Sequence, residues 1–245
     1  MDCAKAVIFD YIGTLVNCKN YSMEASEDKL WEALKIEGFE VSKNHFLEEY
    51  RLAHQKYRKI RYEQYREVTN TVWVAEALSS LGFKVSANDP KVKAALNVFF
   101  QDFIDSLELR EGAKKLFKQI KKQYKVALVS NFTYAPVIYK SLRKLGLNEF
   151  FRAVAVSEAV GWRKPNSRIF HHVLSRLQIS AHEAVYIGDS PIEDIGGAKE
   201  VGFKTIFVSS QFNDLKDLAE SQQIPDHIAK NISSIYEILS QNPSN

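Results

Sequence analysis

The sequence contains few cysteines, no long hydrophobic run and no strong excess of either charge. Two cysteines, Cys3 and Cys18, are too few for a disulfide framework or a structural zinc site, and they favour a reducing, cytoplasmic location. No apolar stretch reaches the roughly 18 to 20 residues that cross a bilayer, which argues against a membrane protein. The first apolar stretch ends at Asp10, too early for a signal peptide. With 33 basic and 30 acidic side chains, the net charge of +3 does not indicate a nucleic-acid partner.

Short aliphatic runs alternate with amphipathic segments along most of the chain. The 245 residues are 45% hydrophobic, enough to bury a sizeable core in one or two domains. Five runs have the length and composition of buried strands, at residues 6–9, 126–129, 153–156, 184–187 and 205–208. Three segments among them have the spacing of amphipathic helices, at residues 111–123, 135–145 and 169–177. This alternation predicts an α/β fold with a parallel, doubly wound sheet.

Residues 17–106 interrupt this alternation with consecutive helical segments. The helices are predicted at residues 25–37, 43–65, 70–81 and 91–104. Because this insertion follows the first strand, we expect a sheet-containing core formed by residues 1–16 and 107–245 and an all-helical domain formed by residues 17–106. The large aromatic side chains of the insertion are predicted to pack its interior: Trp31, Phe39, Trp73, Phe99, Phe100 and Phe103.

Polar side chains stand where the predicted strands end. Asp10 follows the first strand, Ser130 and Asn131 follow the second, and Asp189 follows the fourth, while Lys164 lies in a loop before a helix. The carboxyl ends of parallel strands meet in one crevice, so these groups should lie close together. Two carboxylates suit a hard divalent cation such as Mg²⁺, and nearby lysine, hydroxyl and amide groups suit an anion.

These groups form an ordered set of four motifs. The motifs are Asp10-Tyr11-Ile12-Gly13-Thr14, Ser130, Lys164, and Gly188-Asp189 followed by Asp194. In order and strand context the set resembles the haloacid dehalogenase (HAD) superfamily, and the helical insertion stands where that family carries its cap. The resemblance implies a Rossmann-like core, a helical cap and hydrolase activity.

The resemblance also implies roles for the carboxylates. Asp10 would be the nucleophile and form a covalent aspartyl intermediate that water hydrolyses. Mg²⁺ would be held by Asp10, the backbone carbonyl of Ile12 and Asp189, and Asp194 would orient this metal shell.

Three further residues would serve the substrate. By the same resemblance, Lys164 would place positive charge beside the nucleophile, and the hydroxyl of Ser130 and the backbone amide of Asn131 would bind phosphate oxygens. A small anionic metabolite is therefore the expected partner. The sequence leaves a monomer and a homodimer equally open.

The motif departs from the phosphatase pattern at Ile12. Phosphatases of the family have an aspartate at this position, which protonates the leaving alcohol and later activates water, and an aliphatic side chain transfers no proton. Two branches have a non-acidic residue there: 2-haloacid dehalogenases, with Asp-x-Tyr-Gly-Thr, and phosphonoacetaldehyde hydrolase, with Asp-x-Ala-Gly-Thr. Halide needs no proton to leave, which favours a dehalogenase, but dehalogenases replace the Gly-Asp motif that this chain keeps at Asp189.

Residues 50–67 bear on the alternatives, because basic and tyrosine side chains alternate there. Arg51 lies in a stretch similar to the cap helix that carries the halide-binding arginine of dehalogenases. Lys56 and Lys59 could supply the Schiff-base lysine of a phosphonoacetaldehyde hydrolase. The same stretch superficially suits nucleic acid, but a solvated helix face explains it better. We therefore favour a Mg²⁺-dependent phosphatase, with a metal-independent 2-haloacid dehalogenase as the alternative and a non-catalytic ligand-binding protein as a third possibility.

Overall fold

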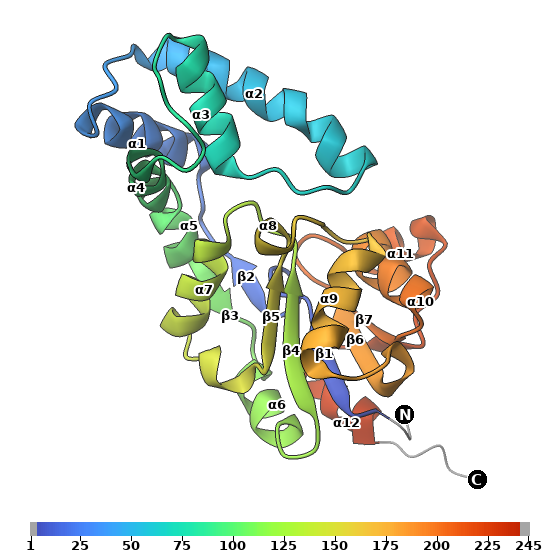
Figure 1. Ribbon diagram of the computed structural model, residues 1–245. Coiled ribbons are helices and arrows are strands. Elements are labelled where there is room, and N and C mark those ends of the chain that lie inside the picture. Colours follow the sequence, from blue (N-terminus) through green and yellow to red (C-terminus); the bar gives the residue numbers. More distant parts are fainter. Residues whose placement is uncertain (1–3, 241–245) are drawn as a thin grey trace.

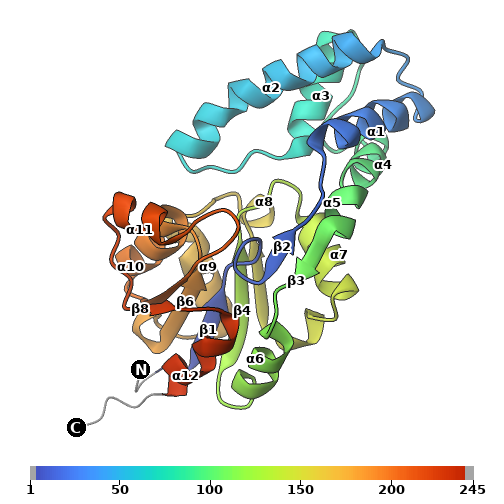
Figure 2. The ribbon, with the colours of Figure 1, turned by 180° about the vertical axis from the view of Figure 1, so that it is seen from behind.

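A six-stranded parallel sheet forms the centre of the molecule. The computed structural model describes residues 4–240, and the strands lie in the order β5-β4-β1-β6-β7-β8 (Figures 1 and 2). Their bounds are β1 (Ala6–Phe9), β4 (Lys125–Ser130), β5 (Ala153–Val156), β6 (Ala184–Gly188), β7 (Lys204–Val208) and β8 (His227–Ala229). Strand β1 is central, because Val7 pairs with Val126 on one side and with Val185 on the other.

Helices cover both faces of the sheet, so β1 is apolar along its whole length and fully buried. Alternate residues of a strand point to opposite faces. Val7 and Phe9 pack in one cluster with α6 (Ala113–Ile120), α7 (Ala135–Lys144) and α12 (Ile235–Ser240). Ala6 and Ile8 pack in another cluster with α9 (Ser167–Leu177) and α10 (Gly197–Val201).

Shorter elements follow several of the strands. They are η1 (Asn148–Phe150), α8 (Ser157–Val160), η2 (Ala181–Glu183), the π-helical turn η3 (Pro191–Gly196), α11 (Leu215–Ser221) and η4 (Ile232–Ser234). Of these, η3 begins directly after the loop at the end of β6 and therefore presents its first turn at the carboxyl edge of the sheet.

A helical segment lies over the carboxyl ends of the strands (Figure 1). Its helices are α1 (Met23–Ile36), α2 (Lys43–Glu63), α3 (Asn70–Ser80), α4 (Pro90–Phe99) and α5 (Gln101–Ser106). The chain leaves and re-enters the sheet region through an antiparallel pair, β2 (Val16–Cys18) and β3 (Leu107–Leu109), seen in Figure 2. We call residues 23–106 the helical segment.

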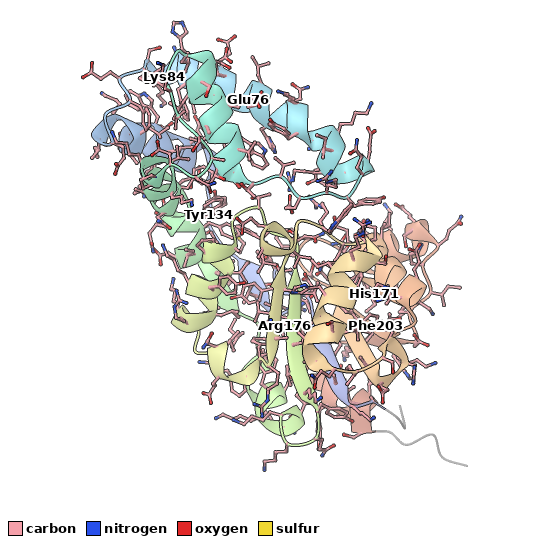
Figure 3. The ribbon with its side chains drawn as sticks, in the orientation of Figure 1. Glu76, Lys84, Tyr134, His171, Arg176 and Phe203 are labelled. Carbon is pink, nitrogen blue, oxygen red and sulfur yellow. The ribbon has the colours of Figure 1, made fainter. Side chains whose placement is uncertain are left out.

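The helical segment has its own apolar core, which touches the sheet region through α7. Tyr134, labelled in Figure 3, stands at this junction, where its ring stacks on Phe100 at 5.5 Å between centroids. Glu67, between α2 and α3, accepts a hydrogen bond from the hydroxyl of Ser157 at 2.5 Å. The segment is therefore attached to the sheet region by both apolar and polar contacts.

The predicted fold class is confirmed, with differences in the short elements. The five predicted strands are present, but the three-residue strands β2, β3 and β8 were not predicted. The helix expected over residues 91–104 is divided at Phe100 into α4 and α5. The division into two domains stays a prediction, and its outermost residues, 1–3 and 241–245, lie outside the described residues. Within residues 4–240, no helix is both long and apolar enough to cross a membrane.

Candidate active site

The parallel strand order brings together residues that are far apart in the sequence. Asp10 follows β1, Ser130 ends the neighbouring strand β4, and Asp189 follows β6 on the other side. Asp194 comes from η3, and Lys164 comes from the loop before α9. All five line one cavity of about 470 Å³ at the carboxyl edge of the sheet, which we call the catalytic cavity. The five side chains therefore lie close together, as the sequence predicts for them.

Lys164 is the central cation of this cavity and is only 2% exposed. Its Nζ donates to Oδ1 of Asp10 and to Oδ1 of Asp194, each at 2.6 Å, and to the hydroxyl of Tyr186 at 3.2 Å. Burial lowers the pKa of Lys164, but the carboxylates of Asp10 and Asp194 outweigh it and hold that pKa well above its usual value. Lys164 is thus a permanent positive charge beside the candidate nucleophile.

The carboxylates experience the opposite effect of burial. Desolvation raises the pKa of Asp10 and that of Asp194 to about 6, although Lys164 lowers both. Burial also raises the pKa of Asp189, with a further increase from Asp194. Three buried carboxylates face one ammonium group, so the cavity has an excess of negative charge when they are ionised.

The carboxylate cluster fits a hard divalent cation. Oxygen atoms of Asp10, Asp189 and Asp194 lie within 4.8 Å of one another. Oδ2 of Asp10 is buried and has no hydrogen-bond partner among the described residues, although buried polar atoms normally have one. Carboxylate oxygens are the ligands that Mg²⁺ prefers, and the excess negative charge would be balanced by such an ion.

Asp189 is held in place by three side-chain donors. The hydroxyl of Thr14 donates to Oδ1 at 2.9 Å, and the hydroxyl of Ser210 and the amide of Asn213 donate to Oδ2 at 2.6 and 3.2 Å. Gly13 allows the close approach of this group, because a Cβ at position 13 would lie 2.5 Å from Oδ2 of Asp189. Gly13 also has a φ of +100°, which favours glycine.

Asn131 positions the lysine loop through its side chain. Its Oδ1 accepts from the backbone N–H of Lys164 at 2.8 Å, and its Nδ2 donates to the backbone carbonyl of Lys164 at 3.0 Å and to Glu193 at 2.9 Å. Glu193 also accepts from Arg163 at 3.0 Å. The amide side chain of Asn131 is therefore engaged in structure, which leaves the backbone N–H as its proposed contact with an anion.

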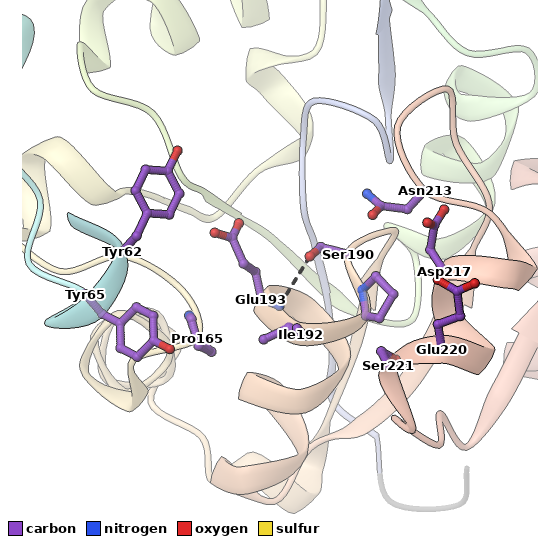
Figure 4. A pocket seen from close by; sticks show the side chains of 11 residues that line it. Tyr62, Tyr65, Pro165, Ser190, Ile192, Glu193, Asn213, Asp217, Glu220 and Ser221 are labelled. Atoms are coloured by element: carbon purple, nitrogen blue, oxygen red, sulfur yellow. Dashed lines mark hydrogen bonds between the residues drawn. The ribbon is translucent and has the colours of Figure 1, made fainter. Parts of the chain in front are cut away.

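The rim of the catalytic cavity lies between the end of α2 and η3. Figure 4 shows Tyr62, in the last turn of α2, and Tyr65, just after α2, on one side, with Glu193 and Ser190 in the middle and Asn213 on the far side. The dashed line is the bond from the backbone N–H of Glu193 to the hydroxyl of Ser190, 3.2 Å long. Tyr62, Ser190, Glu193 and Asn213 line both this open hollow, of about 580 Å³, and the catalytic cavity.

Of the predicted residues Ile12 and Arg51, only Ile12 lies at the catalytic cavity. Ile12 lines the catalytic cavity, so the position that holds an acid in phosphatases is occupied here by an aliphatic side chain. Arg51 is not brought to the site: its side chain is 62% exposed on α2 and pairs with Glu27 at 2.6 Å. Arg51 therefore does not line the catalytic cavity, and its role in substrate binding stays a prediction.

Several residues of the site were not singled out from the sequence. Ser210, Asn213 and Tyr186 hold Asp189 and Lys164, yet no role was assigned to them. A signal for Ser210 was available, because it stands two residues after the end of β7 and so at the same edge of the sheet. Tyr186 lies inside β6 and reads as an ordinary core residue.

Comparison with known proteins identifies the family. The model of the hydrolase family described as "haloacid dehalogenase-like hydrolase" matches residues 4–202, which is most of the chain. The chain belongs to this family. The resemblance noted in the four motifs is thereby confirmed, and the protein is a HAD hydrolase.

Relatives of this HAD hydrolase include named phosphatases. It is 29% identical over 177 residues to haloacid dehalogenase-like hydrolase domain-containing protein 3 of Bos taurus, covering 70% of this chain and 69% of the relative. It is 28% identical to ribulose-1,5-bisphosphate 5-phosphatase of Halopiger xanaduensis, covering 59% and 62%. It is 33% identical to glyceraldehyde 3-phosphate phosphatase of Methanothermobacter thermautotrophicus, covering 48% and 52%. The match thus spans between about half and seven tenths of the length of these relatives.

Solved structures of both activity classes share the fold. A 2-haloacid dehalogenase from Pseudomonas syringae has a TM-score of 0.70 at 21% identity, covering 97% of this chain and 98% of that chain. A HAD phosphatase from Thermococcus onnurineus has a TM-score of 0.64 at 19% identity, covering 98% and 100%. At such identities the likeness establishes the fold and does not discriminate between phosphatase and dehalogenase.

Proposed function

We propose that this HAD hydrolase is a Mg²⁺-dependent phosphatase of a small phosphorylated metabolite, with Asp10 as its nucleophile. The observation that carries the proposal is the buried cluster of Asp10, Asp189 and Asp194, which includes an unpartnered oxygen of Asp10 and is linked to Lys164. A halide displacement has no need of this excess negative charge. The phosphatase names of two relatives support the same activity.

In the proposed reaction, Asp10 is the nucleophile, and Lys164, Ser130 and Asn131 bind the phosphoryl group. A carboxylate oxygen of Asp10 attacks phosphorus, the bond from phosphorus to the ester oxygen breaks, and the alcohol leaves with a proton taken from water. A water molecule then attacks the phosphorus of the aspartyl phosphate, which breaks its bond to Asp10, releases phosphate and regenerates the carboxylate. Lys164 balances negative charge on the transferring group. Ser130 and the backbone N–H of Asn131 hold phosphate oxygens at the end of β4.

The metal-binding residues would be Asp10, the backbone carbonyl of Ile12 and Asp189, with Asp194 behind them. When bound there, Mg²⁺ supplies positive charge that allows an anionic nucleophile to approach an anionic phosphate. Thr14, Ser210 and Asn213 fix the orientation of Asp189 before any ligand arrives.

We also propose that residues 17–106 act as a cap over a core formed by residues 1–16 and 107–245. The support is the position of α2, whose last turn lies at the rim of the catalytic cavity through Tyr62. Such a cap would exclude water and select the substrate. With only two cysteines in the chain, we propose a cytoplasmic location.

A dehalogenase remains the second candidate because of one observation, the aliphatic side chain of Ile12 in the catalytic cavity. The test measures phosphate release from p-nitrophenyl phosphate with and without Mg²⁺ and halide release from 2-chloropropionate, using one preparation and Asp10→Asn as the blank. We expect Mg²⁺-dependent phosphate release that the variant lacks.

Asp189→Asn separates the two activities. It should abolish a Mg²⁺-dependent reaction, because it removes a metal ligand, and leave metal-free halide displacement comparatively intact. Full phosphatase activity in this variant would contradict the proposal. Halide release without metal would move the assignment to a dehalogenase, and the absence of both activities would favour a ligand-binding protein.

A further inference from the structure

A second cavity, of about 410 Å³, lies between the helical segment and the sheet region beside the catalytic cavity. We call it the aromatic cavity, because most of its wall consists of aromatic rings. They include Tyr21, Tyr50, Trp73, Phe99, Phe100 and Phe132. Trp73, Phe99 and Phe100 pack in the interior of the helical segment, as predicted, and they also line this cavity.

The aromatic cavity adjoins the catalytic cavity through shared walls. Phe103 and Phe132 line both cavities. Their ring centroids are 5.4 Å apart, and Phe132 also contacts Phe100 at 5.6 Å. An apolar surface therefore runs from the proposed position of the phosphoryl group, near Asn131, into the helical segment.

The charged groups of the aromatic cavity are already paired. Glu27 accepts from Arg51 at 2.6 Å, and Arg61 donates to Glu67 at 2.8 Å. Burial lowers the pKa of His54, with further lowering by Arg61 and Arg58, so this ring is neutral at pH 7. Among the described residues that line the cavity, Arg61 is thus the only permanent cation, and Glu67 already neutralises it. A second phosphate or a carboxylate in this space would meet no free positive charge and would face Glu27.

We propose that the aromatic cavity binds the organic part of the substrate and that this part is an uncharged aromatic group. The inference rests on the proposed phosphatase function and deepens it. Aromatic side chains offer faces and edges for ring contacts, and burial of a ring away from water is favourable in proportion to its apolar area. The substrate class is therefore the phosphate monoester of an uncharged aromatic alcohol, in contrast to the sugar phosphates named for two relatives.

Two polar atoms in the wall are consistent with a polar substituent on that ring. Nε1 of Trp73 and Oδ1 of Asn70 are buried and have no partner among the described residues. Both are covered by neighbouring side chains, so a ligand would reach them only after a small shift of the wall. The aromatic faces, rather than these two atoms, carry the proposed contact.

The first test compares benzyl phosphate with ethyl phosphate on the wild-type protein with Mg²⁺. Both esters release a primary alcohol of similar acidity, so the missing acid at Ile12 affects them to a similar degree and the ring is the main difference. We expect kcat/KM to be roughly 10- to 100-fold higher for benzyl phosphate, from the apolar area of the ring. Glyceraldehyde 3-phosphate and ribulose 1,5-bisphosphate should resemble or fall below ethyl phosphate.

A matched pair of variants assigns this preference to the cavity. Tyr21→Leu removes a cavity ring that packs edge-to-face on Phe103 at 5.1 Å. Phe83→Leu removes an equivalent pair with Phe39, at 5.4 Å, elsewhere in the helical segment. Tyr21→Leu should reduce the preference for the benzyl ester by about threefold or more, and Phe83→Leu should leave it unchanged. Far-ultraviolet circular dichroism and thermal unfolding check that both variants are folded.

Binding provides a readout that does not depend on turnover. Benzylphosphonate and ethylphosphonate are titrated calorimetrically into the wild-type protein with Mg²⁺. The benzyl compound should bind more tightly and with a more negative heat-capacity change, the mark of buried apolar surface.

The two readouts separate the inference from the proposed function. Hydrolysis of both esters at equal kcat/KM would overturn the aromatic substrate and leave the phosphatase intact. Preferential binding of benzylphosphonate without hydrolysis of any ester would support the aromatic cavity and overturn the phosphatase. Equal binding of the two phosphonates, or a preference that Tyr21→Leu does not reduce, would overturn the cavity assignment.

Discussion

Ile12 affects the departure of the alcohol in the first step of the proposed reaction, because its side chain cannot donate a proton to the leaving oxygen. It stands two residues after the nucleophile and lines the catalytic cavity. The lack of an acid slows cleavage only slightly when the alcohol is a good leaving group, but it slows cleavage of an alkyl ester strongly. General acid-base catalysis contributes about 10² to 10⁴ in rate where it operates.

The variant Ile12→Asp should therefore raise kcat for ethyl phosphate by about 10² or more. It should raise kcat for p-nitrophenyl phosphate much less, because that phenolate leaves without a proton. Steady-state kinetics with both esters measure the difference, and Ile12→Asn controls for polarity without an acid. The same rise in Ile12→Asn would show that proton transfer is not what position 12 lacks. An equal rise with both esters would show that position 12 lacks activation of water in the second step, which both esters share, and not protonation of the leaving alcohol.

Lys164 should be needed for stability as well as for activity. Lys164→Met leaves the carboxylates of Asp10 and Asp194 buried without their cation, and breaking a buried pair in this way costs about 3–5 kcal/mol. We expect a lower urea midpoint in the presence of EDTA, partial recovery of stability with Mg²⁺, and no recovery of phosphate release. Lys59→Met, which removes an exposed lysine, is the control. Unchanged stability without metal would contradict the role of Lys164 as the balancing charge.

At the residue scale, the candidate catalytic residues are easier to predict from the sequence than the residues that hold them in place. Asp10, Ser130 and Asp189 stand at the ends of apolar runs, which the sequence displays directly. Ser210 and Asn213 reach Asp189 only because the loop after β7 turns back toward β6. The course of such a loop depends on backbone conformation that composition does not specify.

On helix α2 also, the sequence does not specify which side chains reach the catalytic cavity, as Arg51 shows. The buried stripe of α2 includes Phe46, Tyr50 and Ala53, whose spacing faces the interior of the helical segment. Arg51 lies beside this stripe and is exposed, so it pairs with Glu27 instead of facing the catalytic cavity. The spacing gives the buried face of α2 but not the angle at which α2 crosses the sheet.

Among the elements, the connection after α2 depends on one carboxylate. Glu67 accepts from Arg61 at 2.8 Å and from the hydroxyl of Ser157 at 2.5 Å, so it joins the helical segment to the end of β5. The Glu67 and Arg61 side chains are 1% and 8% exposed. This contact orients the last turn of α2, which carries Tyr62 to the catalytic cavity.

Glu67→Ala should destabilise the protein by about 3–5 kcal/mol, because it leaves the buried guanidinium of Arg61 unpaired. Glu63→Ala is the matched control: Glu63 pairs with Lys59 at 3.9 Å with both side chains exposed, and such pairs contribute about 0–1 kcal/mol. Urea unfolding of the two variants measures the difference. Equal free energies of unfolding would show that the Glu67 contact does not hold the helical segment in place.

Element prediction succeeded where apolar runs were long enough to have a period. The five strands of four to six residues were identified, whereas β2, β3 and β8 have three residues each and no recognisable alternation. The break at Phe100 was missed because α4 and α5 share continuous apolar spacing, and no proline or glycine marks the boundary. The local sequence therefore predicts the longer helices and strands, whereas the short strands and helix breaks depend on tertiary packing.

In the whole molecule, the parallel topology accounts for the clustering of charge. The strand order places β1 between β4 and β6, so Asp10 meets residues more than a hundred positions away. The sequence predicts this juxtaposition because strand-helix alternation leaves few other topologies. It does not predict the aromatic cavity, which depends on how the helical segment sits over the sheet.

The same clustering should make stability depend on pH and metal together. Burial raises the pKa of Asp10 and that of Asp194 from their usual 3.8 to about 6. Between these values the folded state binds more protons than the unfolded state, so the free energy of unfolding of the metal-free protein should fall as pH rises from about 4 to 6. The proposed Mg²⁺ would bind the ionised carboxylates, so its stabilising effect should grow over the same range.

We therefore expect Mg²⁺ to raise Tm more at pH 7.5 than at pH 5. In a chain of this size, each kcal/mol of added free energy of unfolding raises Tm by about 2–4 °C. Thermal unfolding at both pH values, with EDTA or with Mg²⁺, measures the increment. Asp189→Asn should lose most of it, whereas Asp217→Asn, on the exposed helix α11, should keep it. If Mg²⁺ raises Tm by the same amount at both pH values, protonation of the buried carboxylates does not compete with metal binding. If Mg²⁺ still raises Tm in Asp189→Asn, the ion binds elsewhere.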